Sequence, residues 1–470
     1  MLRDINISLS DGALATASSA TGIHAKIGAS PIASTEAIQI RSTMNAKRIK
    51  ELLGQSPLAD AVMESIDNGS NVIYCLPVAP TTAGSSGSVT ATVTGTGGMT
   101  VSGAPTNRFN VVVKVTVGGG LNEAAIVYSL DGGSVFGAEQ TVPANGVMTL
   151  ANTGITLGFD AGESGFVVGD QFSFATTAPA MSNADVLAAL DQVRNINATI
   201  EFVHVVGVSV PALWAACGEA AAKYHGDYKR PLFIVAEAPA PTSGQLADDY
   251  TTSLVSLQQG VSSIYVQVVA ARGVYTRLDG VTADINLAGV ICGMYAAASV
   301  QQSIGETKSF TISESKLTAL TPAGIIDEIG TLDDARYLTV RRYDGLSGWY
   351  VTNARMMCPE GSDYKYAERI RTTNKIVREV RRQLLTQMQT TVDIANLDAE
   401  LSAIAELAMA PVDTMVDRKE ISSARIVVPE GQDILGSETL QLVIRYVPVG
   451  HIRAIEVDLG MENPYAKGAS

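Results

Sequence analysis

The stretch Gly348-Trp349-Tyr350-Val351-Thr352-Asn353-Ala354-Arg355 opens the segment from which the fold of this chain is most directly predicted. Its aromatic and β-branched residues are typical of a strand. A strongly basic helix is expected next, from Lys365 to about Met388, because apolar residues recur there at three-, four- and seven-residue steps. The residues of this pattern are Ile370, Val377, Val380, Leu384 and Met388.

Beyond the basic helix, a second helix is expected from roughly Asn396 to Met409, and strands follow it. In a strand every second side chain lies on the same face, so alternating apolar residues indicate a half-buried strand. The apolar residues are Leu440, Leu442, Ile444 and Tyr446 in one expected strand and Ile455, Val457 and Leu459 in the last one. Residues 345–470 are therefore predicted to form a C-terminal α+β domain.

The strand, its Ala-Arg pair, the Arg-rich helix and the closing strand from Ile452 to Leu459 resemble the C-terminal domain of contractile tail sheath proteins. This is the family of bacteriophage tails, R-type bacteriocins and related contractile injection systems. The resemblance covers the C-terminal third best and the middle third in outline. It implies a structural subunit that polymerises around an inner tube and contracts to drive the tube through a target cell envelope.

The resemblance also implies the partners of the chain. Other copies of the chain would form stacked rings in a helical sheath around an inner tail tube protein. Baseplate and terminator proteins would lie at the two ends. The protein would assemble in the host cytoplasm and then become part of a phage tail or an extracellular contractile particle.

The composition is that of a folded, acidic protein with several domains. At 470 residues the chain is too long for one ordinary core, so roughly two to four domains are expected. A hydrophobic fraction of 46% and a charged fraction of 17% argue against global disorder. The net charge of −14 is opposite to that of a typical nucleic-acid binder, so we expect no nucleic acid as a partner.

Neither a secretory signal nor membrane insertion is expected. The start of the chain, Met1 to Asn6, has no apolar core, and the most hydrophobic helix candidate, Ile285 to Val300, is short and rich in alanine. The four cysteines lie far apart without a CxxC pair, so buried, reduced thiols are expected. They are Cys75, Cys217, Cys292 and Cys358.

A change of composition at Pro80 marks an inserted domain. From Thr81 to Ala178 the chain is dominated by Gly, Ser, Thr and Val, with strand signals separated by turns. The expected strands are Ser88–Val93, Asn110–Val117, Ala125–Ser129 and Phe166–Phe174. We predict an all-β sandwich, residues 81–179, inserted into a host domain at an exposed loop.

The host domain, residues 21–80 and 180–344, is predicted to be α/β. Apolar strands alternate with helices from Ser182 onward, which indicates a parallel sheet covered on both faces. The expected helices are Ala46–Leu53, Pro57–Asn68, Asn183–Arg194, Pro211–Tyr224, Gln245–Leu257 and Asp284–Gln302. The expected strands are Ala37–Arg41, Val72–Val78, Thr199–Val206, Pro231–Ala236 and Ser262–Ala270.

The sequence lacks the local motifs of nucleotide and metal chemistry. It has no G-x-x-x-x-G-K-[ST] loop, and the four histidines lack metal-ligand spacing. His204, in a buried-strand pattern, is expected to be a core histidine, and Asp131, Asp160 and Asp170 match no calcium loop. A catalytic triad is spatial and stays open, although nucleophile-elbow and papain-type signatures are missing. We expect no catalytic, cofactor or metal site, and a protein that is not an enzyme.

The basic helix is the strongest interface signal. Seven basic residues against two acidic ones lie between Lys365 and Arg382. A solvated helix face is the simplest interpretation. However, arginines outnumber lysines five to two in a chain of net negative charge, and the planar arginine fork suits protein interfaces. The expected tube-facing residues are Arg371, Lys375, Arg378, Arg381 and Arg382.

Both chain ends carry an alternating strand without a nearby hairpin partner. Such strands either pair within their own subunit or are donated to the sheet of another subunit. In sheath proteins both ends are donated, so the resemblance implies inter-subunit strands in an N-terminal arm, residues 1–20, and at the C-terminus. The residues concerned are Ile5, Ile7 and Leu9 at one end and Ile455, Val457 and Leu459 at the other.

Two other functions fit parts of the sequence. The α/β pattern with a β insertion also suits a cytoplasmic α/β enzyme with a β-sandwich substrate- or carbohydrate-binding insertion. The Thr/Gly/Val-rich insertion alone suggests an adhesin-like binding module.

Overall fold

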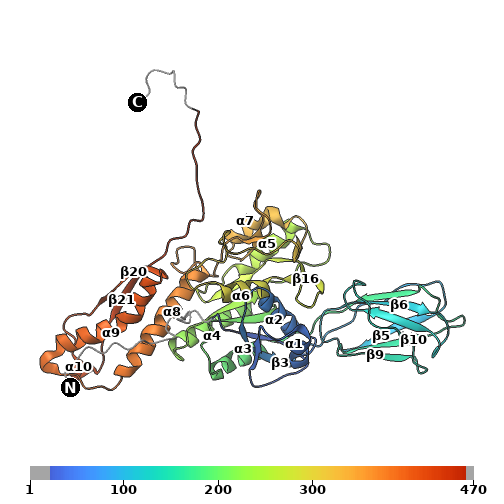
Figure 1. The fold of residues 1–470 in the computed structure, drawn as a ribbon, viewed down its shortest axis with the longest axis horizontal. Coiled ribbons are helices and arrows are strands. Elements are labelled where there is room, and N and C mark those ends of the chain that lie inside the picture. Colours follow the sequence, from blue (N-terminus) through green and yellow to red (C-terminus); the bar gives the residue numbers. More distant parts are fainter. Residues whose placement is uncertain (1–21, 462–470) are drawn as a thin grey trace, which may run out of the picture. The chain divides into compact units, whose positions relative to one another are not determined.

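The computed structural model describes residues 22–461, and the chain divides into two compact units between Met388 and Gln389 (Figure 1). The expected N-terminal strand with Ile5, Ile7 and Leu9 lies outside the described residues.

The first unit is built on a six-stranded sheet with the order β14-β13-β12-β1-β3-β2. Neighbouring strands run parallel, except that β2 pairs antiparallel with β3 at one edge. The strands are β1 (His24–Ala29), β2 (Ile38–Arg41), β3 (Val72–Val78), β12 (Phe202–Val208), β13 (Phe233–Glu237) and β14 (Val266–Val269). The predicted mixed α/β class is confirmed, and β3 joins the strands that follow the insertion in one sheet.

Helices cover both faces of this sheet because both faces are apolar. They are α1 (Ala46–Leu53), α2 (Pro57–Asp67), α3 (Asn183–Gln192), α4 (Pro211–Gly226), α5 (Ala247–Gln258) and α6 (Ala288–Ala297). On one face Ile27 and Val203 share a core with α3, α4 and α5. On the other face Phe202 and Phe233 pack with α6, and Ile73 packs with α1 and α2.

Two elements of the first unit differ from the sequence prediction. The central strand β1 reads His-Ala-Lys-Ile-Gly-Ala, a pattern that does not indicate a strand, yet all six of its residues are buried. Residues 284–286, expected in a helix, lie in β16 (Thr282–Asn286) because they pair with β15 (Arg272–Thr276). β17 (Leu317–Leu320) completes this antiparallel sheet, and a short helix, α7 (Ile329–Asp334), follows it.

Residues between β3 and α3 form two antiparallel sheets. One has the order β5-β10-β9 and the other β4-β11-β6-β7-β8. The strands are β4 (Thr90–Thr92), β5 (Gly98–Gly103), β6 (Asn110–Val117), β7 (Ala125–Ser129), β8 (Gln140–Thr141), β9 (Val147–Leu150), β10 (Ile155–Asp160) and β11 (Gln171–Ala175). Residues of both sheets, including Leu157 and Phe172, share one apolar core. Two sheets packed face to face in this way make a β-sandwich.

The aromatic strand and the basic helix also belong to the first unit. The strand is short, β19 (Tyr350–Val351), and pairs with β18 (Val340–Arg341). The helix is α8 (Ala367–Leu384). Trp349 and Ile370 lie in the same apolar core as Phe202 of the large sheet. The predicted segment 345–470 therefore spans the division between the two compact units.

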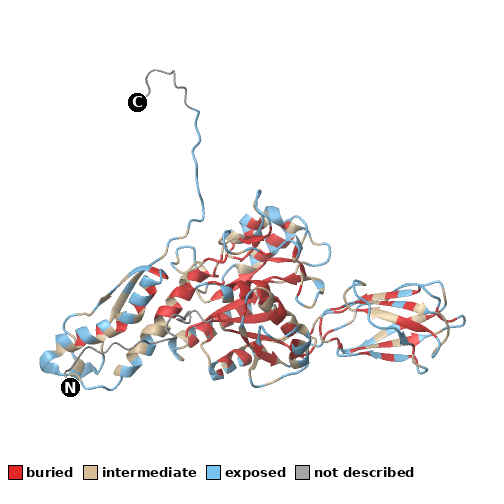
Figure 2. Cartoon of the chain, viewed as in Figure 1, coloured by how far each residue is buried: buried red, intermediate tan, exposed pale blue. Residues whose placement is uncertain are grey.

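The second unit consists of a long helix and a two-stranded hairpin. α9 (Leu397–Asp417) buries a stripe with steps of three and four residues, made of Leu401, Ala405, Ala408, Val412 and Met415. β20 (Ile421–Val427), which was not expected, pairs antiparallel with β21 (Val443–Pro448), and a short helix, α10 (Ile434–Ser437), lies between them. Residues 449–461 form neither helix nor strand, and most hairpin residues are at least partly exposed (Figure 2).

Candidate subunit-interface surfaces

The N-terminal half of α8 faces inward. Arg371 is fully buried, and its Nε donates to Glu201 Oε1 at 2.6 Å. Its other guanidinium nitrogens donate to the carbonyl oxygens of Tyr295, Ala298 and Ser299 at 2.9, 3.1 and 3.3 Å. These carbonyls lie at the C-terminal end of α6, where helix carbonyls lack intrahelical partners. Arg371 thus pairs with a buried carboxylate and caps a helix at the same time.

This geometry corrects the expectation for two of the tube-facing residues. Arg371 and Lys375 are 0% and 1% exposed, so neither side chain is available to a partner. For Arg371 the physical reason is that Glu201, which directly precedes β12, supplies a buried negative charge that needs a cation. A run of basic residues looks the same in sequence whether it faces solvent or such a carboxylate.

The C-terminal half of α8 is more open. Arg378 is partly buried and donates to the carbonyl oxygen of Pro231 at 3.2 Å, and burial lowers its pKa. Arg381 and Arg382 are exposed, and Arg382 pairs with Glu379 at 2.8 Å. Of the five basic residues expected at an interface, Arg381 and Arg382 are therefore the exposed ones.

The C-terminal residues expose an alternating apolar pattern. Ile455, Val457 and Leu459 are 79%, 79% and 93% exposed, and no strand of the described residues pairs with them. In the same unit, β20 and β21 pair only with each other, so each strand has an unpaired outer edge among the described residues. An exposed strand edge is a template for pairing with another chain.

A buried polar cluster crosses the large sheet. Lys26 Nζ lies 2.7 Å from His204 Nδ1, and His204 Nε2 lies 3.2 Å from Glu237 Oε1. Burial, together with the nearby Lys26 charge, lowers the pKa of His204 to about 4. His204 is fully buried, so the expectation of a core histidine is confirmed. The cluster explains how β1 can bury a lysine.

A second polar cluster lies where the β-sandwich joins the α/β part. Arg277 pairs with Asp60 at 3.1 Å, and Asn107 of the insertion donates to the same carboxylate at 2.8 Å. Burial raises the pKa of nearby Glu64 to about 8, although the Arg277 charge opposes this shift. These groups are buried, except for the partly buried Asp60, so they stabilise the junction and offer little to a substrate.

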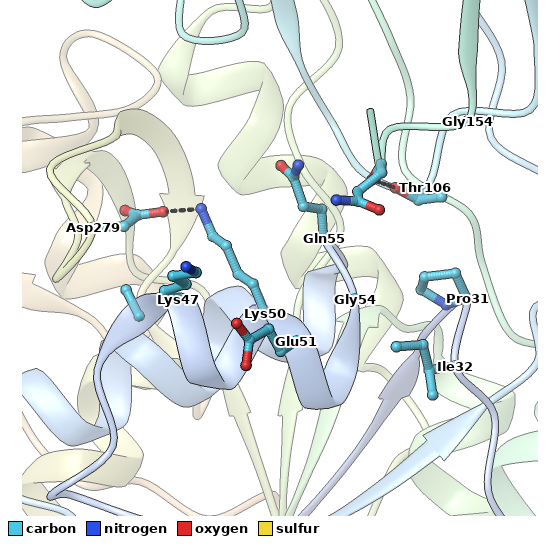
Figure 3. Close-up of a pocket in the computed structure, with 12 residues that line it drawn as sticks. Pro31, Ile32, Lys47, Lys50, Glu51, Gly54, Gln55, Thr106, Gly154 and Asp279 are labelled. Atoms are coloured by element: carbon cyan, nitrogen blue, oxygen red, sulfur yellow. Dashed lines mark hydrogen bonds and ion pairs between the residues drawn. The ribbon is translucent and has the colours of Figure 1, made fainter. Parts of the chain in front are cut away.

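A groove of about 870 Å³ lies between α1 and two loops of the insertion (Figure 3). Lys50 extends from α1 to Asp279, with 2.7 Å between Nζ and Oδ2, and Glu51 pairs with Arg48 at 3.1 Å. Three charged groups of the groove, those of Lys50, Glu51 and Asp279, are therefore paired within the chain, which gives no support to a substrate site.

The remaining candidates from the sequence have structural roles. The carboxylate of Asp170 accepts from the backbone amides of Thr94 and Val167 at 2.7 and 2.9 Å, and Asp131 and Asp160 accept from nearby loop amides. The four cysteines are buried and free. Between residues 22 and 461, no group of three or more His, Cys, Asp or Glu side chains is arranged to hold a metal ion. No helix in that range is long and apolar enough to cross a membrane.

Comparison with known proteins places the chain in a family and a fold. Residues 2–355 match the family described as DUF2586, N-terminal domain, and residues 363–466 match DUF2586, C-terminal domain. No curated protein sequence matches the chain.

Two solved structures carry the likeness in fold, and a third is similar at a lower TM-score. The contracted sheath complex of PVC, an extracellular contractile injection system, has a TM-score of 0.55 at 11% identity, with 98% of each chain covered. The contracted helical sheath of the anti-feeding prophage has a TM-score of 0.54 at 11% identity, covering 98% of this chain and 99% of that one. The sheath tail protein of Desulfitobacterium hafniense has a TM-score of 0.49 at 13% identity, covering 95% and 100%. The chain therefore belongs to the DUF2586 family and has the fold of contractile sheath proteins.

Proposed function

We propose that this protein is the structural subunit of a contractile sheath, which polymerises around an inner tube and contracts to drive the tube through a target envelope. The observation that carries the proposal is the C-terminal segment, residues 449–461. Its alternating apolar side chains are exposed, although burying them would be favourable by roughly 1.5–3 kcal/mol each. A segment of this kind needs a partner, and the sheath fold suggests other copies of the chain.

The β20–β21 hairpin of a neighbouring copy is the acceptor that we favour. An isolated two-stranded hairpin is only marginally stable, and additional strands stabilise it. Backbone hydrogen bonds across a new strand contribute about 0.5–1.5 kcal/mol each, so the strength would come from repetition around the ring. The N-terminal arm, residues 1–20 with Ile5, Ile7 and Leu9, would supply a further strand.

The exposed arginines suit the inner surface of the sheath. Arg381 and Arg382, with the partly buried Arg378, would face an acidic tube. Baseplate and terminator proteins would hold the ends of the polymer. Assembly would occur in the host cytoplasm, and the finished particle would be a phage tail or an extracellular contractile device.

We also propose a division of labour within the chain. Residues 21–80 and 180–344 would form the α/β domain, and the sandwich, residues 81–179, a separable outer domain. The α8 helix and the second unit, in the segment 345–470, would connect subunits. Deletion of residues 81–179 should leave polymerisation intact, and an insoluble or monomeric product would contradict this division.

A structural role is preferred over an α/β enzyme for a physical reason. Most side chains of the polar clusters of the first unit are buried, and they hydrogen-bond or form ion pairs with groups of the same chain. Contraction would need no nucleotide, because an extended metastable polymer releases free energy when new contacts form between subunits.

Electron microscopy tests the proposal directly. The full chain, produced alone and together with the tube protein from its own particle, should form wide hollow cylinders in negative stain. Dispersed monomers under both conditions would contradict a sheath function. If the protein binds cell-surface ligands and forms no cylinders, an adhesin would be favoured instead.

A further inference from the structure

The two compact units are joined by one covalent segment, because the second unit is the continuous stretch that begins at Gln389. α8 is the last long helix before that point, and only a short turn, Leu385–Gln387, follows it within the first unit. Tension that travels along the chain from the second unit therefore reaches the first unit through α8. How α8 is attached decides how much tension the link can bear.

Arg371 is a buried polar attachment of α8 to two other parts of the first unit. Its guanidinium joins Glu201, which directly precedes the inner strand β12, to the end of α6, so one side chain connects three elements. Each of these hydrogen bonds involves a charged group, and such bonds are stronger than neutral ones. The planar fork matches several acceptors at once, which a lysine ammonium cannot reproduce.

Two buried polar groups beside Arg371 are not fully satisfied. Asn374 is fully buried, yet neither polar atom of its side chain has a hydrogen-bond partner among residues 22–461. The same holds for Glu201 Oε2. A partly satisfied buried network is costly, so loss of the bonds that Arg371 makes would leave further buried groups without partners.

We propose that Arg371 and Glu201 form a latch that holds α8 on the α/β sheet when tension passes between the two units. The latch rests on the proposed sheath function only for the origin of the tension. In a sheath, second units bound to neighbouring copies would pull on α8 as the subunits move. The latch would let the first unit follow that movement without detachment of the helix.

Hydrogen exchange on the unassembled full chain tests the attachment. Arg371→Lys keeps the charge, and Glu201→Gln keeps the shape. Both should raise the exchange rates of the α8 amides after residue 371 by about tenfold or more, since bonds to charged groups are being lost. Arg382→Ala, on the exposed side of the same helix, is the matched control and should change these rates by less than about threefold. Equal rates in all three variants would overturn the latch.

Single-molecule pulling tests whether the contact between Arg371 and Glu201 resists tension applied between the two units. Cysteines introduced at exposed Glu219 in the first unit and Ser402 in the second would apply tension across the link, and the four native cysteines are buried. Arg371→Lys should lower the first rupture force in this geometry. It should leave the force unchanged when the handles are at Glu36 and Glu219, both in the first unit. An equal loss in both geometries would make Arg371 an ordinary core residue, and no loss in either would also overturn the proposal.

These results are independent of polymerisation. If the chain forms no cylinders but the two assays give the expected changes, the sheath function fails and the latch stands. If cylinders form and Arg371→Lys behaves as the wild type in both assays, the latch proposal is wrong and the sheath function is supported.

Discussion

The large sheet of the first unit and the hairpin of the second differ in how completely they bury their own residues. Strands β1, β12, β13 and β14 are buried almost throughout, and helices cover both faces of the sheet. The hairpin has one buried residue, Ile421, among its described residues, and its strands have open edges. The first unit is thus complete in one chain, whereas the second presents surfaces that another chain can complete.

The difference means that stability depends mainly on the first unit and assembly mainly on the second. Substitutions in the first unit should act on the free energy of unfolding of a single chain. Substitutions at the C-terminus should act on assembly and leave the single chain nearly unchanged.

The largest effect is expected from Trp214→Ala. Trp214 is fully buried, its indole N–H donates to Ser209 Oγ at 2.7 Å, and its ring packs edge-on against Tyr337. Loss of this side chain should lower the free energy of unfolding by about 3–5 kcal/mol. Denaturant unfolding followed by circular dichroism measures the loss, and a change below 1 kcal/mol, on the order of a surface substitution, would contradict a self-sufficient core.

A smaller effect is expected from pH. The pKa of Glu64, raised to about 8 by burial, means that the folded chain keeps a proton that the unfolded chain releases near its usual pKa of 4.5. Stability should therefore fall as the pH rises from 4.5 to 8. His204, with its pKa lowered to about 4, acts in the opposite sense, because stability is lost as the pH falls below 6.5.

Of Glu64 and His204, only Glu64 lowers the stability between pH 6.5 and 8. The free energy of unfolding should therefore fall by about 2 kcal/mol over this range. Glu64→Gln should flatten that part of the curve in thermal or denaturant unfolding. A wild-type curve that is flat or rises over this range would contradict a protonated Glu64 in the folded chain.

A still smaller effect on the single chain is expected from Ile455→Asp combined with Val457→Asp. Both residues are exposed, so the free energy of unfolding should change by less than about 0.5 kcal/mol. Polymerisation, measured by sedimentation, should nevertheless be lost. Glu456→Gln, between the two positions, is the control. Normal polymerisation of the double variant would remove the C-terminal segment from the interface.

The smallest effect is expected from Arg381→Glu with Arg382→Glu. Exposed ion pairs contribute only about 0.2–1 kcal/mol, so the variant should weaken tube-templated assembly without abolishing it. Charges are screened beyond roughly 8–10 Å, so added salt should weaken assembly of the wild type in the same way. Glu379→Lys, on the same helix, is the control and should not weaken tube-templated assembly. Templated assembly that is unaffected by the arginine variants at low salt would place the tube contact elsewhere.

The parts predicted well from sequence are those where local pattern and tertiary environment agree. β6 and β7 have the predicted bounds, Asn110–Val117 and Ala125–Ser129, because alternating valines and isoleucine meet an apolar core there. α8 and α9 are helices in the predicted places, but of the apolar pattern predicted for α8 only Ile370 is buried, and Met388 is 70% exposed. The alternation of Ala424 and Ile426 with polar residues was a signal for β20 that sequence analysis overlooked.

The parts that sequence could not predict depend on distant partners. Lys26 can be buried in β1 because His204, 178 residues away, lies 2.7 Å from it. Arg371 is buried because Glu201, 170 residues away, pairs with it. No local pattern reports such neighbours, so the sequence does not indicate β1, and it does not distinguish the buried basic residues of α8 from residues at an interface with a partner.

The most direct test of the account is a cryo-electron microscopy map of the assembled polymer that resolves residues 449–461 and the β20–β21 hairpin. If the C-terminal segment is donated between subunits, residues 452–459 form a strand on an outer edge of the hairpin of a neighbouring copy, with Ile455, Val457 and Leu459 buried. A map in which this segment pairs only with its own chain, or stays in solvent, would contradict strand donation.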